Sequence, residues 1–512
     1  MAETDETRQA WSRRQLLIAG GGAAAAAVAG GGAGWALRRP AETAQPAAEP
    51  AAAPPRYRSR PDLNALPQVT VTTAAAGAAS GYVFLTPASG KGLWGPLIVD
   101  DAGEPVWFRK VPDPATVAID FKAQRYRGKP VLTWWEGTIG GTGGQGVGQG
   151  EFVIADQAYR EITRVRAAGT EQADQHDFVI TGDDTALFWV YDPVPRDLSA
   201  LGGPADGVLH DGLIQEIDIA TGRVVWQWRA SDHVDLDESY APLPQGESAK
   251  LPYDYFHANS VGVDADGDIL VSARHTWACY KIARRSGEIR WRLGGKRSDF
   301  PLDERSTFSW QHDVRRRRDG AYSLFDNGAG VTKERDYSRG LVLRLDEAAR
   351  TATFVREFVQ EQRVSAPTQG SFRELSDGGS FAGWGQSPHF TEYAPDGTVR
   401  FGGHLPLDNQ SYRAYRMDWE GLPTDQPALG VRVENGAVIV SASWNGATKV
   451  ARWRARAGGQ PGRDTLAAVA ETARTGFETT LTVPGTPEYV VAEALDAAGN
   501  VLGTSSAVPV RI

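Results

Sequence analysis

Hydrophobic and polar residues alternate with a period of two along much of the chain, which is the spacing of β-strands that bury one face. Val224, Trp226 and Trp228 follow this pattern, and so do Leu343 and Leu345. Short turns that contain Gly, Asp or Asn separate the runs, as expected for antiparallel hairpins. The pattern predicts an all-β protein.

One sequence pattern recurs six times, about fifty to sixty residues apart. It consists of an apolar strand, a turn, and a second strand rich in Trp, Arg and Val. The copies are residues 95–111, 150–167, 212–230, 278–295, 340–358 and 389–405. Another hairpin precedes each copy, for example residues 122–137, 176–192, 311–327 and 371–386. Two hairpins make the four strands of one propeller blade, so we predict a six-bladed β-propeller over residues 61–418.

The chain after the repeats has a different pattern. Residues 421–512 contain short strands of a small β-sandwich, and "EYVVAEALDAAGNVLGTSS" resembles the closing hairpin of a fibronectin type III domain. We expect this C-terminal fibronectin-III-like β-sandwich to have a structural or adhesive role.

The N-terminus carries features of export. Two arginines in "SRRQLL" precede an apolar stretch over residues 16–37, which resembles a twin-arginine signal. The stretch has about the length that spans a bilayer, so residues 1–40 could also stay as a membrane anchor. Residues 41–60 form a Pro/Ala linker. We therefore predict a protein that is extracellular, periplasmic or anchored to the outer face of the cytoplasmic membrane.

The net charge and the cysteine content argue against some classes of protein and site. The formal net charge of −9 argues against a nucleic-acid binder, because phosphate contacts need a basic face. The single cysteine, Cys279, excludes an intramolecular disulfide and a thiolate metal cluster.

Three histidines open the first hairpin of three successive blades: His176, His257 and His312. In a propeller that strand lies nearest the axis, so we expect the three side chains to converge at one mouth of the channel. Asn259 points to the same side of its strand as His257. A four-residue turn would place Arg274 opposite His257, and a three-residue turn would place His275 there.

These residues resemble a known family. "FHANS…ILVSARHTWACYKI…GEIRWRLGG" and the later "FSWQHDV" are similar to the bacterial arylsulfate sulfotransferases, over about residues 81–404. The resemblance implies transfer of a sulfuryl group from an aryl sulfate donor to a phenolic acceptor, without phosphoadenosine phosphosulfate or another cofactor and without a metal. It also implies that His312 is transiently sulfurylated, that Asn259 and Arg274 hold sulfuryl oxygens, that His257 is a general acid/base, and that His176 is a further active-site histidine.

Three other functions fit parts of this pattern. Histidines from several blades could bind a metal, although Arg274 would repel a divalent cation. "TGRVVWQW" and "SGEIRWRL" look like the tryptophan docking repeats of quinoprotein dehydrogenases, but six units are too few for that family. A non-catalytic propeller could also bind a sulfated or carboxylated ligand. Metal analysis and turnover assays discriminate among these alternatives.

Overall fold

The computed structural model describes residues 56–140, 146–169, 172–246, 251–462 and 465–511. Within these residues helix is limited to 3-10 turns, of which four are described in full with three residues each, so the all-β prediction is confirmed. They are η1 (Pro61–Leu63), η2 (Ser199–Leu201), η3 (Ala230–Asp232) and η4 (Leu236–Glu238). In the described part of the chain no helix is long and apolar enough to span a bilayer. The predicted signal or anchor, and most of the predicted linker, lie outside the described residues.

Each of the six predicted hairpin repeats is an antiparallel hairpin, and each belongs to a sheet of at least four strands. The first sheet contains β2 (Tyr82–Leu85), β3 (Leu97–Val99), β4 (Pro105–Phe108) and β25 (Tyr415–Met417). The fourth contains β13 (Ala258–Val263), β14 (Ile269–Ala273), β15 (Ala278–Ile282) and β16 (Ile289–Gly294). The fifth contains β17 (His312–Arg316), β18 (Tyr322–Asp326), β19 (Arg339–Asp346) and β20 (Thr351–Phe358). The sixth contains β21 (Ser371–Glu374), β22 (Ser380–Gly383), β23 (His389–Tyr393), β24 (Val399–His404) and β1 (Thr70–Thr73).

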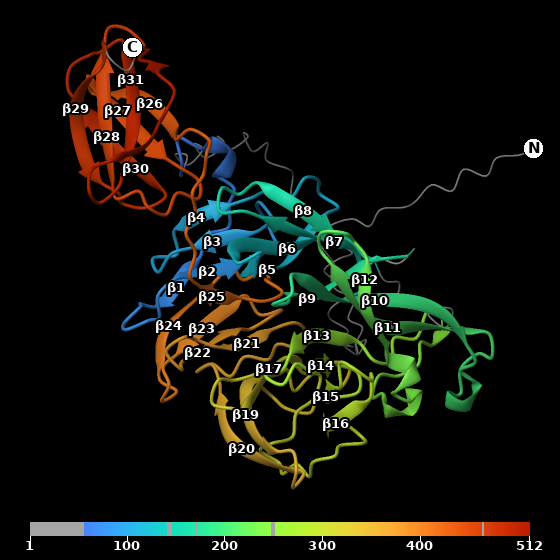
Figure 1. Ribbon diagram of the computed structural model, residues 1–512. Coiled ribbons are helices and arrows are strands. Elements are labelled where there is room, and N and C mark those ends of the chain that lie inside the picture. The colour runs from blue at the N-terminus through green and yellow to red at the C-terminus, as the bar shows by residue number, and fades with distance from the viewer. Residues whose placement is uncertain (1–55, 141–145, 170–171, 247–250, 463–464, 512) are drawn as a thin grey trace, which may run out of the picture.

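The second and third groups of strands are joined into one eight-stranded sheet by a single bridge, Gly150↔Ala173. The second group is β5 (Val117–Tyr126), β6 (Lys129–Ile139), β7 (Gly148–Ala155) and β8 (Glu161–Val165). The third group is β9 (Ala173–Ile180), β10 (Thr185–Arg196), β11 (Gly207–Asp218) and β12 (Val224–Arg229). In Figure 1 strands β9, β13, β17 and β21 lie toward the middle of this arrangement, and β16 and β20 lie toward its periphery.

Strands from the two ends of this region complete its first and last sheets. β25 pairs with β2, although more than three hundred residues separate them, with Phe84 opposite Tyr415. β1 adds to β24 in the same way, with Thr70 opposite His404. These pairings cover sheet edges that would otherwise expose free backbone groups.

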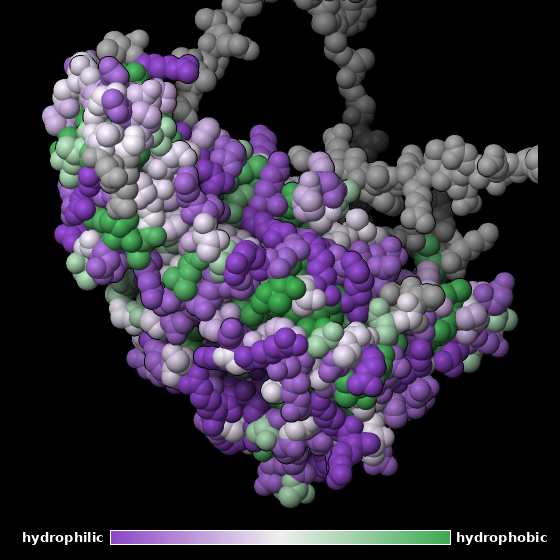
Figure 2. Space-filling view, turned by 45° about the horizontal axis from the view of Figure 1, so that its top comes forward, coloured by the Kyte–Doolittle hydropathy of each residue, from purple (hydrophilic) through white to green (hydrophobic). Residues whose placement is uncertain are grey.

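Apolar side chains pack between neighbouring sheets. For example, the Trp291 ring on β16 meets Tyr322 on β18 edge to face, with centroids 5.6 Å apart. Trp134, Trp189 and Trp384 are among the other large side chains that are fully buried. On the face seen in Figure 2 the surface is mainly hydrophilic, with separate apolar patches.

A buried network of charges joins all six groups of strands. Arg413, just before β25, donates to Asp120 on β5, to Asp177 on β9 and to the carbonyl oxygen of Asn259 on β13. The other members are Lys122, Asp313, Arg315, Arg373 and Tyr415. Burial would raise the pKa of Asp177, but Arg315, Arg413 and Lys122 hold it well below its usual value. Three carboxylates therefore face four cations.

The C-terminal strands form two facing sheets around a separate core, which includes Val440, Trp453 and Leu481. One sheet is β26 (Ala428–Glu434), β27 (Ala437–Ser443) and β30 (Glu478–Val483). The other is β28 (Arg452–Gly458), β29 (Ala467–Ala473), β31 (Tyr489–Leu495), β32 (Val501–Thr504) and β33 (Val508–Pro509). Asn445 exchanges two 3.0 Å hydrogen bonds with the backbone of Phe108 and so ties this unit to the first sheet.

Candidate functional site

The six predicted site residues lie at corresponding ends of three neighbouring groups of strands. His176 is on β9, His257 precedes β13, Asn259 is within β13, and His312 opens β17. Arg274 and His275 directly follow β14. All six are at most 8% exposed. The structure therefore brings together residues that are up to 136 positions apart in the sequence.

The His257 ring contacts the rings of His176 and His275, and a tyrosine ring links this group to His312. Ring centroids are 4.9 Å apart for His176 and His257, and 4.5 Å apart for His257 and His275. The Tyr412 ring connects this group to His312, with centroids 5.9 Å from His176 and 6.5 Å from His312.

A β-bulge determines which residue faces His257. The turn of the β13–β14 hairpin pairs Asp264 with Asp268, and this three-residue loop would place His275 opposite His257. Between Ser260 and Ala258 the register shifts by one residue at Asn259. As a result the Arg274 amide donates to the His257 carbonyl oxygen at 2.8 Å.

Arg274 and His275 both reach the site. The Arg274 Nη1 atom donates to His275 Nε2 at 2.9 Å, and the guanidinium lies 4.9 Å from the centre of the Trp310 ring. Burial lowers the pKa of Arg274 to about 10, so the side chain is still cationic at neutral pH. Its Nε atom is buried without a hydrogen-bond partner, which leaves a donor for an anion.

Each of two histidines is held by a buried aspartate that the sequence analysis did not select. The Nδ1 atom of His257 bonds to Asp254, and that of His176 bonds to Asp174. Burial raises the pKa of the Asp254 carboxyl, and burial together with His176 and Arg274 lowers the pKa of His257 well below its usual value. His257 also has a left-handed backbone, with φ of 46°. An aspartate of this kind fixes the tautomer and the orientation of its histidine.

The tautomer of His312 is set by Asn327, which lies at the end of β18. The Asn327 amide nitrogen donates to the carbonyl oxygens of Ala366 and Gln369, at 2.7 and 2.9 Å. Its Oδ1 atom therefore faces His312 Nδ1, at 2.8 Å, and can only accept. The proton of neutral His312 is consequently on Nδ1, and Nε2 carries a lone pair.

Burial and Arg274 lower the pKa of His312 well below its usual value, although the Asn327 hydrogen bond opposes this shift. The neutral form therefore persists into mildly acidic solution. A neutral imidazole with a free Nε2 lone pair is suited to nucleophilic attack.

Two polar side chains in the site have unused hydrogen-bonding groups. The Tyr412 hydroxyl, 4% exposed, is buried without a partner. Asn259 donates from Nδ2 to the Gln311 carbonyl oxygen at 2.7 Å, and its Oδ1 has no partner. One amide proton of Asn259 is thus already engaged, and only the second is available to a ligand.

The same cluster is poorly suited to a metal ion. Asp254, His257 and His275 offer ligand atoms within 4.8 Å of one another. Both ring nitrogens of His275 are engaged, however, Nδ1 by the Asp254 carbonyl oxygen and Nε2 by the Arg274 guanidinium. A divalent cation would have to displace Arg274 or lie against its charge, so the arrangement favours an anion.

Sequence reasoning missed Asp174, Asp254, Asn327 and Tyr412. The two aspartates precede their histidines by two and three positions, which is a signal that could have been used. Asn327 lies at the end of the hairpin that begins at His312, and Tyr412 comes from another part of the fold; the local sequence marks neither of them. Asp177 and Asp313, which directly follow His176 and His312, belong to the buried charge network instead. Consecutive residues of a strand point to opposite faces, so these aspartates point away from the site.

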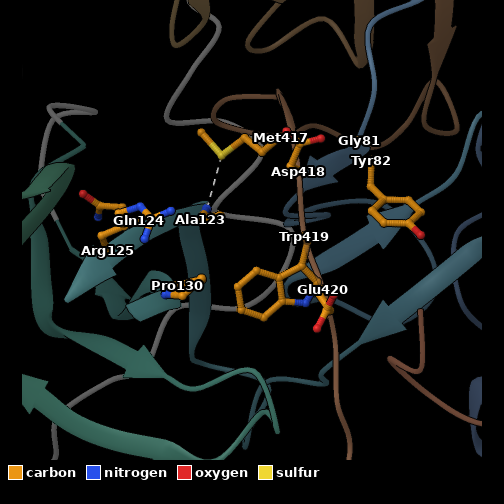
Figure 3. Close-up of a pocket in the computed structure, with 10 residues that line it drawn as sticks. All are labelled: Gly81, Tyr82, Ala123, Gln124, Arg125, Pro130, Met417, Asp418, Trp419 and Glu420. Carbon is orange, nitrogen blue, oxygen red and sulfur yellow. Dashed lines mark hydrogen bonds between the residues drawn. The ribbon is translucent and has the colours of Figure 1, made fainter. Parts of the chain in front are cut away.

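A cavity of about 730 Å³ lies elsewhere, between β2, β5, β25 and residues 418–420 (Figure 3). Tyr82, Pro130 and Trp419 line it, and the Ala123 amide donates to Met417 Sδ at 3.2 Å. None of the predicted site residues is part of its wall.

These features define an all-β protein with a buried, cation-containing histidine site that is suited to an anionic substrate. The family model for arylsulfotransferases (ASST) matches residues 122–404, which include all six predicted site residues. The match covers more than half of the chain, and the chain belongs to the arylsulfotransferase family.

The other comparisons are more distant. A search of curated proteins found no significant match. A protein of unknown function from Bacteroides caccae is 13% identical, with a TM-score of 0.40, over 65% of this chain and 98% of its own. A streptogramin B lyase is 10% identical, with a TM-score of 0.34, over 73% and 94%. Structural similarity at this level gives no information about the function of this chain.

Proposed function

We propose that the protein transfers a sulfuryl group from a phenolic sulfate ester to a phenol through a sulfo-histidine at His312. The observation that carries this proposal is the hydrogen bond from His312 Nδ1 to Asn327, which leaves Nε2 free beside the cationic Arg274. Family membership supports arylsulfotransferase activity, and the following steps assign the chemistry to residues.

In the first half-reaction His312 Nε2 attacks the sulfur atom. An S–N bond forms, the bond between sulfur and the aryl oxygen breaks, and its electron pair leaves with the phenolate. His257 protonates the phenolate from Nε2, and its Nδ1 takes a proton from the Asp254 carboxyl, whose raised pKa lets it hold one, so that His257 stays neutral. Arg274, the second Asn259 amide proton and the Tyr412 hydroxyl can stabilise the nonbridging oxygens.

The second half-reaction reverses these events with a new phenol. The acceptor oxygen attacks sulfur, His257 Nε2 takes the phenolic proton, and the S–N electron pair returns to His312 Nε2. Donor and acceptor use the same site in turn, which corresponds to ping-pong kinetics. His176, held by Asp174 next to His257, would help to orient the aryl group or the acceptor.

The proposal extends to architecture and location. We propose that residues 61–418 form a closed six-bladed propeller and residues 421–512 a fibronectin-III-like sandwich. Support comes from the β2–β25 pairing and from the charge network, to which all six groups of strands contribute. We also propose that the protein acts outside the cytoplasm. This part of the proposal rests on the twin arginines, Arg13 and Arg14, and on the apolar stretch that follows them.

The test uses the purified protein with 4-nitrophenyl sulfate. We expect release of 4-nitrophenolate that is faster with added phenol, together with formation of phenyl sulfate. Without an acceptor, intact-mass measurement should show a gain of one SO₃ group per chain. Ligand binding without turnover or mass gain would instead favour the non-catalytic alternative, and stoichiometric iron or zinc in the active site would contradict the proposal.

A second prediction concerns Asn327. Replacement by leucine removes Asn327 Oδ1, the acceptor that selects the Nδ1-protonated form of His312, so we expect kcat to fall about 10²-fold with little change in KM. For comparison, loss of the residue that sets the tautomer of a catalytic histidine can cost about 10⁴-fold.

Ser338→Ala is the matched control for this variant. Ser338 Oγ donates to the Asn327 backbone carbonyl at 2.7 Å and has the same surroundings, but it does not contact His312. We expect it to retain most of kcat. Equal losses of kcat in the two variants would show that Asn327 has only a structural role.

A further inference from the structure

Two histidines outside the proposed active site face each other across a hairpin. His389 and His404 are directly opposite on β23 and β24, and their ring centroids are 5.1 Å apart with an angle of 47° between the planes. Both side chains are partly exposed. They are therefore accessible from solvent, unlike the buried active-site histidines.

The hydrogen bonds of the two rings leave the same nitrogen available. His404 Nδ1 lies 2.7 Å from the Leu405 carbonyl oxygen, which can only accept, so Nδ1 carries the proton and Nε2 the lone pair. His389 Nδ1 lies 2.8 Å from Ser387 Oγ, which can accept in the same way. A ring Nδ1–H held by a protein acceptor is the usual support of a histidine that binds metal through Nε2.

The ring separation agrees with chelation. Two imidazoles bound to one tetrahedral ion at about 2.0–2.1 Å have their ring centres about 5 Å apart. Imidazole ligands suit Zn²⁺, Cu²⁺ and Ni²⁺.

We propose that His389 and His404 bind one divalent transition-metal ion through their Nε2 atoms, with water completing the coordination. The ion would join β23 to β24 at the position where the N-terminal strand β1 pairs, Thr70 being opposite His404. Its role would be to stabilise this last sheet, and it is independent of sulfuryl transfer.

The test is a titration of the full chain, purified without a polyhistidine tag, with ZnCl₂ at pH 7.5. We expect binding of one Zn²⁺ and a saturable rise in Tm, because a ligand that binds only the folded state stabilises it. Both effects should be lost in the His389→Gln/His404→Gln variant. Ser387→Ala, which removes the partner of His389 Nδ1, should weaken binding about 10-fold.

His233→Gln is the matched control. His233 is also partly exposed, but its ring is stacked on Trp228 with centroids 5.1 Å apart and faces no second histidine. This variant should bind Zn²⁺ like the unmodified chain. The proposal is overturned if the unmodified chain does not bind Zn²⁺. It is also overturned if the double variant binds normally, because the ion would then lie elsewhere in the chain.

Discussion

Replacing His312 with alanine is expected to abolish both the SO₃ mass gain and transfer to phenol, with a rate loss of about 10³-fold or more. The reason is that the variant lacks the His312 Nε2 lone pair, which lies near Arg274 while Asn327 holds the proton on Nδ1. Release of 4-nitrophenolate and the intact mass after incubation with 4-nitrophenyl sulfate measure the two losses separately.

His257→Gln is the matched comparison, because His257 is equally buried and belongs to the same cluster. 4-Nitrophenolate is a good leaving group and needs little protonation, so this variant should still acquire the SO₃ group on His312. It should fail with donors whose phenolate is a poor leaving group, because these need the proton from His257. Labelling of the His312→Ala variant to the same extent as the unmodified chain would refute the nucleophile assignment.

The second large effect that we expect is a loss of stability in the Arg413→Met variant. Arg413 has no exposed side-chain surface, and it neutralises Asp120 and Asp177 at 3.1 and 3.0 Å. Its removal takes a directly bonded cation from Asp120 and Asp177 and a donor from the Asn259 carbonyl oxygen, all of them buried, which should lower the free energy of unfolding by about 3–5 kcal/mol. The midpoint of urea unfolding, followed by tryptophan fluorescence, measures this loss.

The control is Arg125→Met, the same change at an exposed arginine of β5, which should alter stability by less than about 0.5 kcal/mol. If Arg413→Met does not fold, Arg413→Lys keeps the charge and should give an intermediate midpoint. An Arg413→Met midpoint equal to that of the Arg125→Met variant would contradict the role given to the network.

Arg413 also connects stability to the site. Its Nη2 atom donates to the Asn259 carbonyl oxygen at 2.7 Å, at the bulge that places Arg274 opposite His257. The charge network therefore helps to hold the register on which the site depends. In the stably folded Arg413→Lys variant we accordingly expect a weaker site as well as a lower unfolding midpoint.

The six repeated hairpins are all present, because alternation and turn residues are local signals. The expected hairpin before the first repeat is absent, since β1 joins the sixth sheet and β25 completes the first. The pairing of β2 with β25 joins strands that are far apart in the sequence, and the repeat pattern indicates it only indirectly. The positions of His176, His257 and His312 were predictable because each occupies the same place in a repeated unit. Asp254 was not selected, although its position three residues before His257 is a usable signal, because sequence proximity alone does not show that the carboxylate folds back onto the ring.

The sequence by itself determined that the chain is an all-β protein and which histidines, asparagine and arginine lie at equivalent strand ends, since these depend on periodicity and repetition. Only the tertiary structure decided that the bulge at Asn259 sets Arg274 opposite His257, that Asn327 selects the tautomer of His312, and that Tyr412 enters the site. The physical reason is that neighbouring segments of the fold hold these features in place: Arg413 donates to the Asn259 carbonyl oxygen at the bulge, and the carbonyl oxygens of Ala366 and Gln369 orient Asn327.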